Sequence, residues 1–441
     1  MIECVELLLH ECRGQEHLYY DLLAEKQVQL VYDDWDGGEV YSALRLNCEE
    51  QAKEHYYVQS SVVQLFRDYF EKELIQVGVK KRSAPILSAR LAGECLDAAY
   101  KEHWPSMFRD FWGYGDMEIS EGMLIPAKWL AYDLLREQRE IGFRRVRIED
   151  YLDRLFYVRL APALPFELTL SQRFEGCLRE VTRIDRAVVS VVCTPDVDFE
   201  QLHTQYAFES DDDGFWGVRP LDSFFSSDDL VDGVTEAIKR GSNIVVCPEL
   251  CCDESGWRLI RERLQLIADW RIVVAGSAHV DMPGTNQREN RLMVFLARED
   301  YANGSPRIDS IQHSKFGDFR FKRPGDREPL REAISRKRKL TAYVVDGILV
   351  AFLVCKDILE HSILDAIRAL GIRVLAVSAM SPKIEEFLCH SEHLAVTANT
   401  FSVVAVSSSE GAASAIVGMP SRHRTVRDQS PDDGSRVTLF D

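Results

Sequence analysis

The sequence lacks several features that would define whole classes of protein. No apolar run reaches the ~18 residues needed to span a bilayer, and the first residues, MIECVELLLHEC, carry acids where a secretory signal has bases. Glycine-rich phosphate loops, a serine-nucleophile elbow and paired zinc-ligand motifs are also missing. We therefore expect a cytoplasmic protein that needs no membrane, no metal and no cofactor.

Positive charge is scarce, and the cysteines form no framework. The chain has 53 Lys and Arg against 71 Asp and Glu, a net charge of -18. This balance argues against a protein that coats nucleic acid non-specifically, and it favours solubility. Its 11 cysteines are scattered without a CxxC pair, and a chain of 441 residues has no need of disulfide staples. Most of the cysteines are therefore interpreted as small buried hydrophobic residues.

The length of the chain predicts two domains, and the first of them has helical patterning. Within residues 1–185, the stretch EEQAKEHYYVQSSVVQLFRDYFEKELIQVG repeats apolar residues at three- and four-residue intervals. The segments Ser88–Tyr100 and Ala127–Gln138 behave in the same way. We expect a mainly helical N-terminal domain, to which the sequence assigns no role.

The pattern changes after Arg186, where short β-branched runs alternate with helical stretches. The runs are AVVSVVC, NIVVC, RIVVAGS, RLMVFLA, ILVAFLVC, RVLAVSA and FSVVAVSSS. The helical stretches are Leu230–Arg240, Gly256–Trp270, Ile358–Leu370 and Ile384–Val396. This alternation predicts an α/β layered domain over residues 186–441, with helices covering the strands.

Polar residues of three kinds follow three of the predicted strands. IVVCPEL ends with Glu249 and Leu250, IQHSKFGDF contains Lys315, and LVAFLVCKD contains Cys355. In open α/β domains the carboxyl ends of strands line the functional crevice, so residues far apart in sequence can meet there. The sequence therefore predicts one site that holds an acid, an ammonium and a thiol.

These three residue types are suited to covalent acyl transfer. A thiol that leaves a strand at the start of a helix lies near unpaired N–H groups, which we expect to favour the thiolate of Cys355. A carboxylate beside it can accept and return protons during attack on a carbonyl or nitrile carbon. An ammonium can stabilise the oxyanion that develops.

The order and context of these motifs resemble the nitrilase superfamily, also called the carbon–nitrogen hydrolases. The family's "fPEl" matches Cys247-Pro248-Glu249-Leu250, its glycine-containing strand before the nucleophile matches residues 347–354, and its "CxD" matches Cys355-Lys356-Asp357. GIRVLAVSAMSP, the segment His390–Asn399 with FSVVAVSSS, and GAASAIVGMP resemble later family segments. The resemblance covers about residues 186–441. It implies a four-layered α-β-β-α sandwich that pairs into homo-oligomers.

The resemblance also implies a reaction path. Glu249 would act as general base and acid, Cys355 would attack, and Lys315 with the backbone N–H of Lys356 would hold the oxyanion. A second active-site glutamate would be Glu332, with Glu328 as the alternative. The substrate would be a small-molecule amide, carbamoyl compound or nitrile. Water would then hydrolyse the thioester, unless an amine takes the acyl group.

The chain departs from the family pattern beside the motifs. Many members have histidine two residues after the lysine, where this chain has Gly317, and an aromatic residue after the cysteine, where it has Lys356. The family's "FPE" after the nucleophile is missing from ILEHSI. A substrate therefore cannot be carried over from a familiar branch of the family.

The stretch between Lys315 and Cys355 is unusually basic, and it supports a second hypothesis. FRFKRPGDREPLREAISRKRK reverses the sign of the chain's net charge locally. It could attract an anionic substrate or a polyanionic partner, or it could be a solvated loop paired with acids elsewhere. The alternative function is therefore a regulatory or binding module in a larger assembly, with residues 320–339 contacting an anionic ligand or a nucleic acid. A protein partner is also left open.

Overall fold

The computed structural model describes part of the chain. The described residues are 60–76, 88, 116–119, 124–126, 155–157, 164–174, 188–210, 215–267, 270–284, 287–298, 307–317, 319–321, 329–335, 337–345, 348–407, 415–419, 424–428 and 437–440. The chain divides into two compact units, one comprising residues 1–115 and 120–160 and the other residues 116–119 and 161–441. No helix among the described residues is long and apolar enough to cross a membrane.

The described elements of the first unit are one helix and one strand pair. Helix α5, Ser60–Gln76, lies within the long stretch predicted to be helical. Phe70 and Leu74, one turn apart, are completely buried, as expected of residues on one helix face. Strands β2, Leu124–Pro126, and β3, Leu155–Tyr157, pair antiparallel. Apart from Ser88, the two other predicted helical segments lie outside the described residues.

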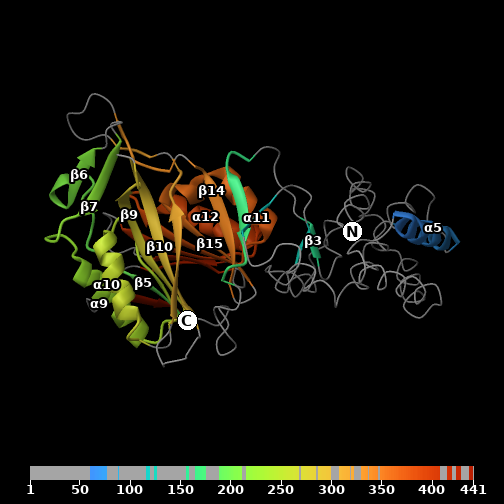
Figure 1. Cartoon of the computed structure of the whole chain (residues 1–441), viewed down its shortest axis with the longest axis horizontal. Helices are drawn as coiled ribbons and strands as arrows, with labels where there is room; N and C mark the ends of the chain where they lie inside the picture. The colour runs from blue at the N-terminus through green and yellow to red at the C-terminus, as the bar shows by residue number, and fades with distance from the viewer. Residues whose placement is uncertain are drawn as a thin grey trace. The chain divides into compact units, whose positions relative to one another are not determined.

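The second unit is built on two sheets (Figure 1). The larger sheet has eight strands in the order β1 (Asp116–Glu118), β4 (Glu167–Ser171), β14 (Lys339–Val345), β15 (Ile348–Val354), β16 (Val374–Met380), β17 (Phe401–Ser407), β18 (Ala415–Met419) and β19 (Arg424–Asp428). The smaller has six, in the order β11 (Arg307–Ser314), β10 (Arg288–Arg298), β9 (Ile272–Asp281), β8 (Ile244–Val246), β5 (Val189–Val192) and β20 (Val437–Phe440).

The sheets face each other, and each carries helices on its outer side. Strand β16 contacts β8 and β9 across the two sheets. Helices α9 (Ser227–Lys239) and α10 (Glu254–Leu264) pack on the six-stranded sheet, while α12 (Ile384–Thr397) packs on the eight-stranded sheet beside α11 (His361–Leu370). The layer order is helix, sheet, sheet, helix. This confirms the predicted α-β-β-α sandwich.

The apolar runs form strands because they are covered on both faces. Every residue of β15, ILVAFLV, and of β16, VLAVSAM, is buried. Parallel strands inside such a layered domain read as continuous apolar runs rather than alternating ones. All seven predicted runs contain a strand, and each of the four predicted helical stretches contains a helix.

The structure adds elements that the sequence did not predict. Strand β4 belongs to the eight-stranded sheet, where it pairs parallel with β14, although it precedes the expected boundary near residue 185. Strands β6, Tyr206–Ser210, and β7, Trp216–Pro220, form a separate antiparallel pair. The stretch Ile358–Leu370 also differs from a single helix: a 3-10 turn, η5, spans Cys355–Leu359, and α11 starts only at His361.

Candidate active site

The three residues that follow strand ends lie in one buried cluster. Glu249 follows β8 by three residues, and Lys315 and Cys355 directly follow β11 and β15. The Nζ atom of Lys315 is 2.8 Å from Glu249 Oε1 and 2.7 Å from Glu332 Oε2. Among these four residues the exposed fraction ranges from 1% to 5%. An ammonium, two carboxylates and a thiol therefore lie together in one buried cluster. Glu328, the alternative second glutamate, lies outside the described residues.

The backbone of Met380, at the end of β16, positions both the carboxylate and the thiol. Its N–H donates to Glu249 Oε2 at 2.9 Å, and its carbonyl accepts from Cys355 Sγ at 3.6 Å. Glu249 also lies close enough to the thiol to affect its pKa. Cys355 has a φ of 48°, in the left-handed region that non-glycine residues seldom adopt. Such strained positions cluster at functional sites.

The protonation states in this cluster follow from burial and from the neighbouring charges. Burial raises the pKa of the Cys355 thiol well above its usual value, and the Glu249 charge raises it further. This corrects the expectation that helix N–H groups favour the thiolate. The five-residue 3-10 turn has a smaller dipole than a longer helix. The sulfur is also buried away from water beside the Glu249 carboxylate, and both conditions disfavour the thiolate. The sulfur therefore needs a base to become a nucleophile.

The two glutamates differ although both are buried. Burial raises the pKa of Glu249; Lys315 opposes that effect and Glu332 adds to it. Burial would also raise the pKa of Glu332, but the Lys315 ammonium and His279 lower it to about 2. The two carboxylates in turn raise the pKa of Lys315 well above its usual value despite its burial. Glu332 is therefore the fixed anion, Lys315 the fixed cation, and Glu249 the group placed to exchange protons.

Asn290, the third residue of β10, links the two glutamates. Its Nδ2 donates to Glu249 Oε1 at 2.8 Å and to Glu332 Oε1 at 2.7 Å. Its carbonyl accepts from the backbone N–H of Lys315, and its own N–H donates to the carbonyl of Ala333. The side chain is completely buried. Sequence reasoning missed Asn290, because it lies in the polar stretch Arg288–Arg291 at the start of β10 and no local pattern marks it.

His279, on the neighbouring strand β9, contacts Glu332 from the other side. Its Nδ1 lies 3.0 Å from the backbone nitrogen and 3.2 Å from the carbonyl oxygen of Val218. Its Nε2 lies 3.4 Å from Glu332 Oε1. Lys315 and Asn290 donate hydrogen bonds to the Glu332 carboxylate, and His279 lies beside it. No local pattern in the sequence predicts this contact, because strand pairing brings the two residues together.

Asp357 fixes the turn that carries the nucleophile to the turn that carries the lysine. Its Oδ1 accepts from the backbone N–H groups of Phe316 and Gly317 at 3.1 and 2.8 Å. Its Oδ2 accepts from Val354 N at 3.2 Å and lies 3.0 Å from His313 Nε2. The backbones approach closely: a Cβ on Gly317 would lie 3.0 Å from the carbonyl carbon of the residue after Cys355. A larger residue at position 317 would push the two turns apart.

We expect Asn290→Ala to slow the alkylation of Cys355 by chloroacetamide about 10- to 100-fold, because hydrogen bonds to charged groups contribute roughly 1.5–3 kcal/mol. Loss of a donor that favours the ionised carboxylate should also raise the pKa of Glu249. The rise of the alkylation rate should therefore move to higher pH. Rates measured by mass spectrometry from pH 5 to 9 would check both effects. Gln265→Ala, at an exposed amide after α10, is the control, and a rate loss without a pH shift would contradict the positioning role.

Comparisons with known proteins find similar structures at low sequence identity. Nit3 of Saccharomyces cerevisiae, a nitrilase superfamily member, is 12% identical, with a TM-score of 0.40 over 59% of this chain and 92% of that one. An amidase from Nesterenkonia sp. AN1 is 13% identical, with a TM-score of 0.37 over 58% of this chain and 92% of that one. The glutamine-dependent NAD+ synthetase of Acinetobacter baumannii is 12% identical, with a TM-score of 0.37 over 58% of this chain and 45% of that one.

No protein-family model and no curated protein matches the sequence. The family likeness consequently rests on the chain itself. Its motifs occur in the order Glu249, Lys315 and Cys355, and its layers follow the order helix, sheet, sheet, helix. In both respects this chain resembles the nitrilase superfamily of carbon–nitrogen hydrolases.

Proposed function

We propose that the domain of residues 186–441 hydrolyses a non-peptide C–N bond of a small amide, carbamoyl compound or nitrile, through a thioester on Cys355. One observation supports this above all: the buried Glu249 carboxylate lies 2.8 Å from the Lys315 ammonium, and the Met380 backbone holds both this carboxylate and the Cys355 thiol. A nucleophile, its base and a fixed positive charge are the parts that acyl transfer requires.

Glu249 has the properties of the general base. The Cys355 thiol holds its proton because its pKa is raised, so attack on the substrate carbon must be coupled to proton transfer. Because the pKa of Glu249 is raised, it lies closer to the pKa of the thiol than that of an ordinary carboxyl group would, which favours proton transfer from the thiol. The same carboxyl would then give its proton to the leaving nitrogen. In the second half of the reaction it would take a proton from the water that attacks the thioester.

Lys315 is suited to stabilising the oxyanion rather than to accepting protons. Its ammonium has three N–H donors, and two of them are directed at Glu249 and Glu332. The third remains for the substrate oxygen, and its raised pKa keeps the ammonium charged. The backbone N–H of Lys356 lies in the first turn of η5, where helical N–H groups have no intrahelical partner. We assign these two donors to the oxyanion, and to Glu332 the task of holding Lys315.

A substrate screen tests this function. The full chain would be incubated with pools of amides, carbamoyl compounds and nitriles while ammonia release is measured, and intact mass spectrometry would follow acyl adducts. We expect ammonia from at least one pool and an adduct on Cys355, both lost in Cys355→Ala. Cys389→Ala, which removes an exposed thiol on α12, should change neither.

Two outcomes separate this proposal from its alternatives. The protein could form a hydroxamate when hydroxylamine is added but release no free acid when hydroxylamine is left out. That result would indicate acyl transfer to an amine instead of hydrolysis. No ammonia from any pool, together with a Cys355 that reacts with chloroacetamide no faster than Cys389, would contradict the enzyme and favour the binding module.

A further inference from the structure

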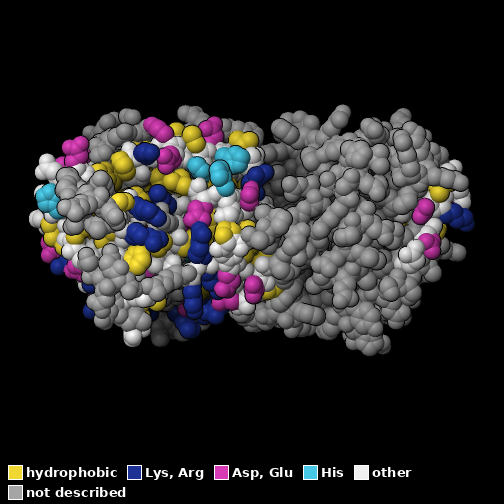
Figure 2. All heavy atoms as spheres, turned by 90° about the horizontal axis from the view of Figure 1, so that it is seen from above, with side chains coloured by type: hydrophobic (Ala, Val, Ile, Leu, Met, Phe, Trp, Pro, Cys, Tyr) yellow, Lys and Arg dark blue, Asp and Glu magenta, His cyan; other side chains and the backbone are white. Residues whose placement is uncertain are grey.

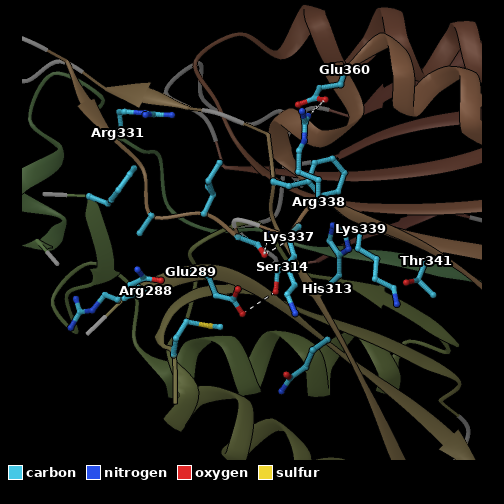
Figure 3. Close-up of a pocket in the computed structure, with 18 residues that line it drawn as sticks. Arg288, Glu289, His313, Ser314, Arg331, Lys337, Arg338, Lys339, Thr341 and Glu360 are labelled. Atoms are coloured by element: carbon cyan, nitrogen blue, oxygen red, sulfur yellow. Dashed lines mark hydrogen bonds and ion pairs between the residues drawn. The ribbon is translucent and has the colours of Figure 1, made fainter. Parts of the chain in front are cut away.

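A cavity lies beside the active-site cluster. Its volume is about 740 Å³, and it is lined by residues of β10 and β11, by the segment before β14, and by Glu360, the residue before α11 (Figure 3). None of the four residues proposed to act in catalysis lines it. Its volume falls within the roughly 300–1,000 Å³ typical of small-molecule sites.

Two backbone segments, residues 314–316 and 331–333, lie between this cavity and the active-site cluster. Ser314 and Phe316 line the cavity, whereas Lys315 between them reaches the glutamates. Arg331 and Ala333 line it as well, whereas Glu332 between them reaches Lys315. This is the alternation of an extended backbone, in which successive side chains point to opposite faces. The two segments are joined by the hydrogen bond from Ser335 N to Lys315 O at 2.9 Å. The same two segments thus place catalytic candidates on one side and cavity-lining residues on the other.

The lining of the cavity is mainly cationic. Five basic side chains, Arg288, Arg331, Lys337, Arg338 and Lys339, face two acidic ones, Glu289 and Glu360. Figure 3 places the first two basic residues on one side of the cavity and the other three on the opposite side. Lys and Arg also gather on one surface of the second unit (Figure 2), although the chain as a whole carries a net charge of -18.

Acids within the described residues only partly neutralise this lining. Arg288 pairs with Asp281 and Glu209, Arg338 pairs with Glu360, and Lys339 Nζ lies 3.1 Å from Glu167 Oε1. Lys337 is exposed, and its charge helps to lower the pKa of Glu167. Glu289 is already engaged by Ser314 and Arg291. The cations are therefore not simply the partners of the cavity's own carboxylates.

We propose that this cavity binds a small molecule with two separated anionic groups, at a site distinct from the active site. One group would contact the side with Arg331 and the other the side with Lys337. Arginine and lysine form their strongest hydrogen bonds with phosphates and carboxylates. Ser335 and Thr341, which also line the cavity, add neutral hydrogen-bonding groups.

Calorimetric titration of the full chain tests the proposal with three probes. Fructose 1,6-bisphosphate has two phosphates, fructose 6-phosphate has one, and adipate has two carboxylates. We expect the bisphosphate to bind at least about tenfold more tightly than the monophosphate, and binding to weaken with added salt. Comparison with adipate decides whether phosphate or carboxylate is preferred.

Variants locate the binding. The double substitution Arg331→Glu with Lys337→Glu should weaken bisphosphate binding at least about tenfold, since both exposed cations become repulsive. The matched reversal Arg258→Glu with Arg263→Glu, at exposed positions on α10, should leave it unchanged. Cys355→Ala should also bind the bisphosphate as the unaltered chain does, whatever the outcome of the substrate screen.

Three results would overturn the proposal. The bisphosphate could fail to bind, or the reversed double variant could keep its affinity. Alternatively, affinity could be lost in Lys356→Ala but kept in the double variant, which would place the anion beside Cys355 instead of in the cavity.

Discussion

Replacing Glu249 by glutamine is expected to slow the modification of Cys355 by chloroacetamide about 10²- to 10⁴-fold at neutral pH, the usual contribution of general base catalysis. The thiol is buried, and its pKa is raised, so very little thiolate exists without a base. Glutamine keeps the shape of the side chain and one acceptor oxygen, but it cannot take the proton. Ammonia release from any substrate found by the screen should fall in parallel.

The pH dependence provides a sharper test than the rate alone. In the unaltered chain the reactive form has Glu249 ionised, so the rate should rise as Glu249 loses its proton. Because burial raises the pKa of Glu249, this rise should lie above the pH range of an ordinary carboxyl group. In Glu249→Gln the rise should move to the alkaline range, where the thiol itself ionises. Lys315 stays charged throughout, because its pKa is raised.

Glu254→Gln is the matched control, since Glu254 is an exposed carboxylate in the first turn of α10. It should change neither the rate nor its pH profile. Alkylation of Cys355 that proceeds equally fast in Glu249→Gln would contradict the assignment of Glu249 as the base. Far-ultraviolet circular dichroism of each variant would establish that the comparison is made between folded proteins.

The sequence predicted those parts of the fold that depend on local pattern. Continuous apolar runs such as ILVAFLV and VLAVSAM can only be stable when both faces are covered, so they predict buried strands. Strand β4 was not predicted, because its sequence, ELTLS, has only five residues and its partner β14 lies far along the chain. Pairing between distant segments leaves no mark within either segment.

The same distinction applies to the site. Glu249 and Cys355 could be picked out because each follows an apolar run directly or closely. The strand before Lys315, RIDSIQHS, is not an apolar run, so Lys315 was found through its place between the other two motifs. Asn290 and His279 could not be picked out, because their contacts with the glutamates arise from the pairing of β9 with β10 and from the β7 backbone. The protonation of the thiol was also out of reach, since burial depends on what the rest of the chain places around the sulfur.

The largest effect on stability is expected from Asp357→Ala. The completely buried carboxylate accepts from three backbone N–H groups and contacts His313, so its removal leaves several buried donors without an acceptor. Loss of a buried, hydrogen-bonded charge costs about 3–5 kcal/mol. We expect the free energy of unfolding in urea to fall by that amount. The free energy of unfolding of Asp357→Asn should lie between those of the unaltered chain and Asp357→Ala. The asparagine keeps one acceptor oxygen, but its NH₂ group faces backbone N–H groups that are donors themselves.

Asp365→Asn is the control, because Asp365 is an exposed acid on α11 whose nearest Arg368 nitrogen is 3.6 Å away. An exposed pair of this kind contributes only about 0–1 kcal/mol. Under conditions where Asp357→Asn remains folded, Cys355 alkylation should still be slower than in the control. The reason is geometric: Asp357 joins the turn after β15 to the turn after β11, so the sulfur and the Lys315 ammonium share one anchor. An Asp357→Ala protein that unfolds at the same urea concentration as the unaltered chain would show that these turns are held together by packing alone.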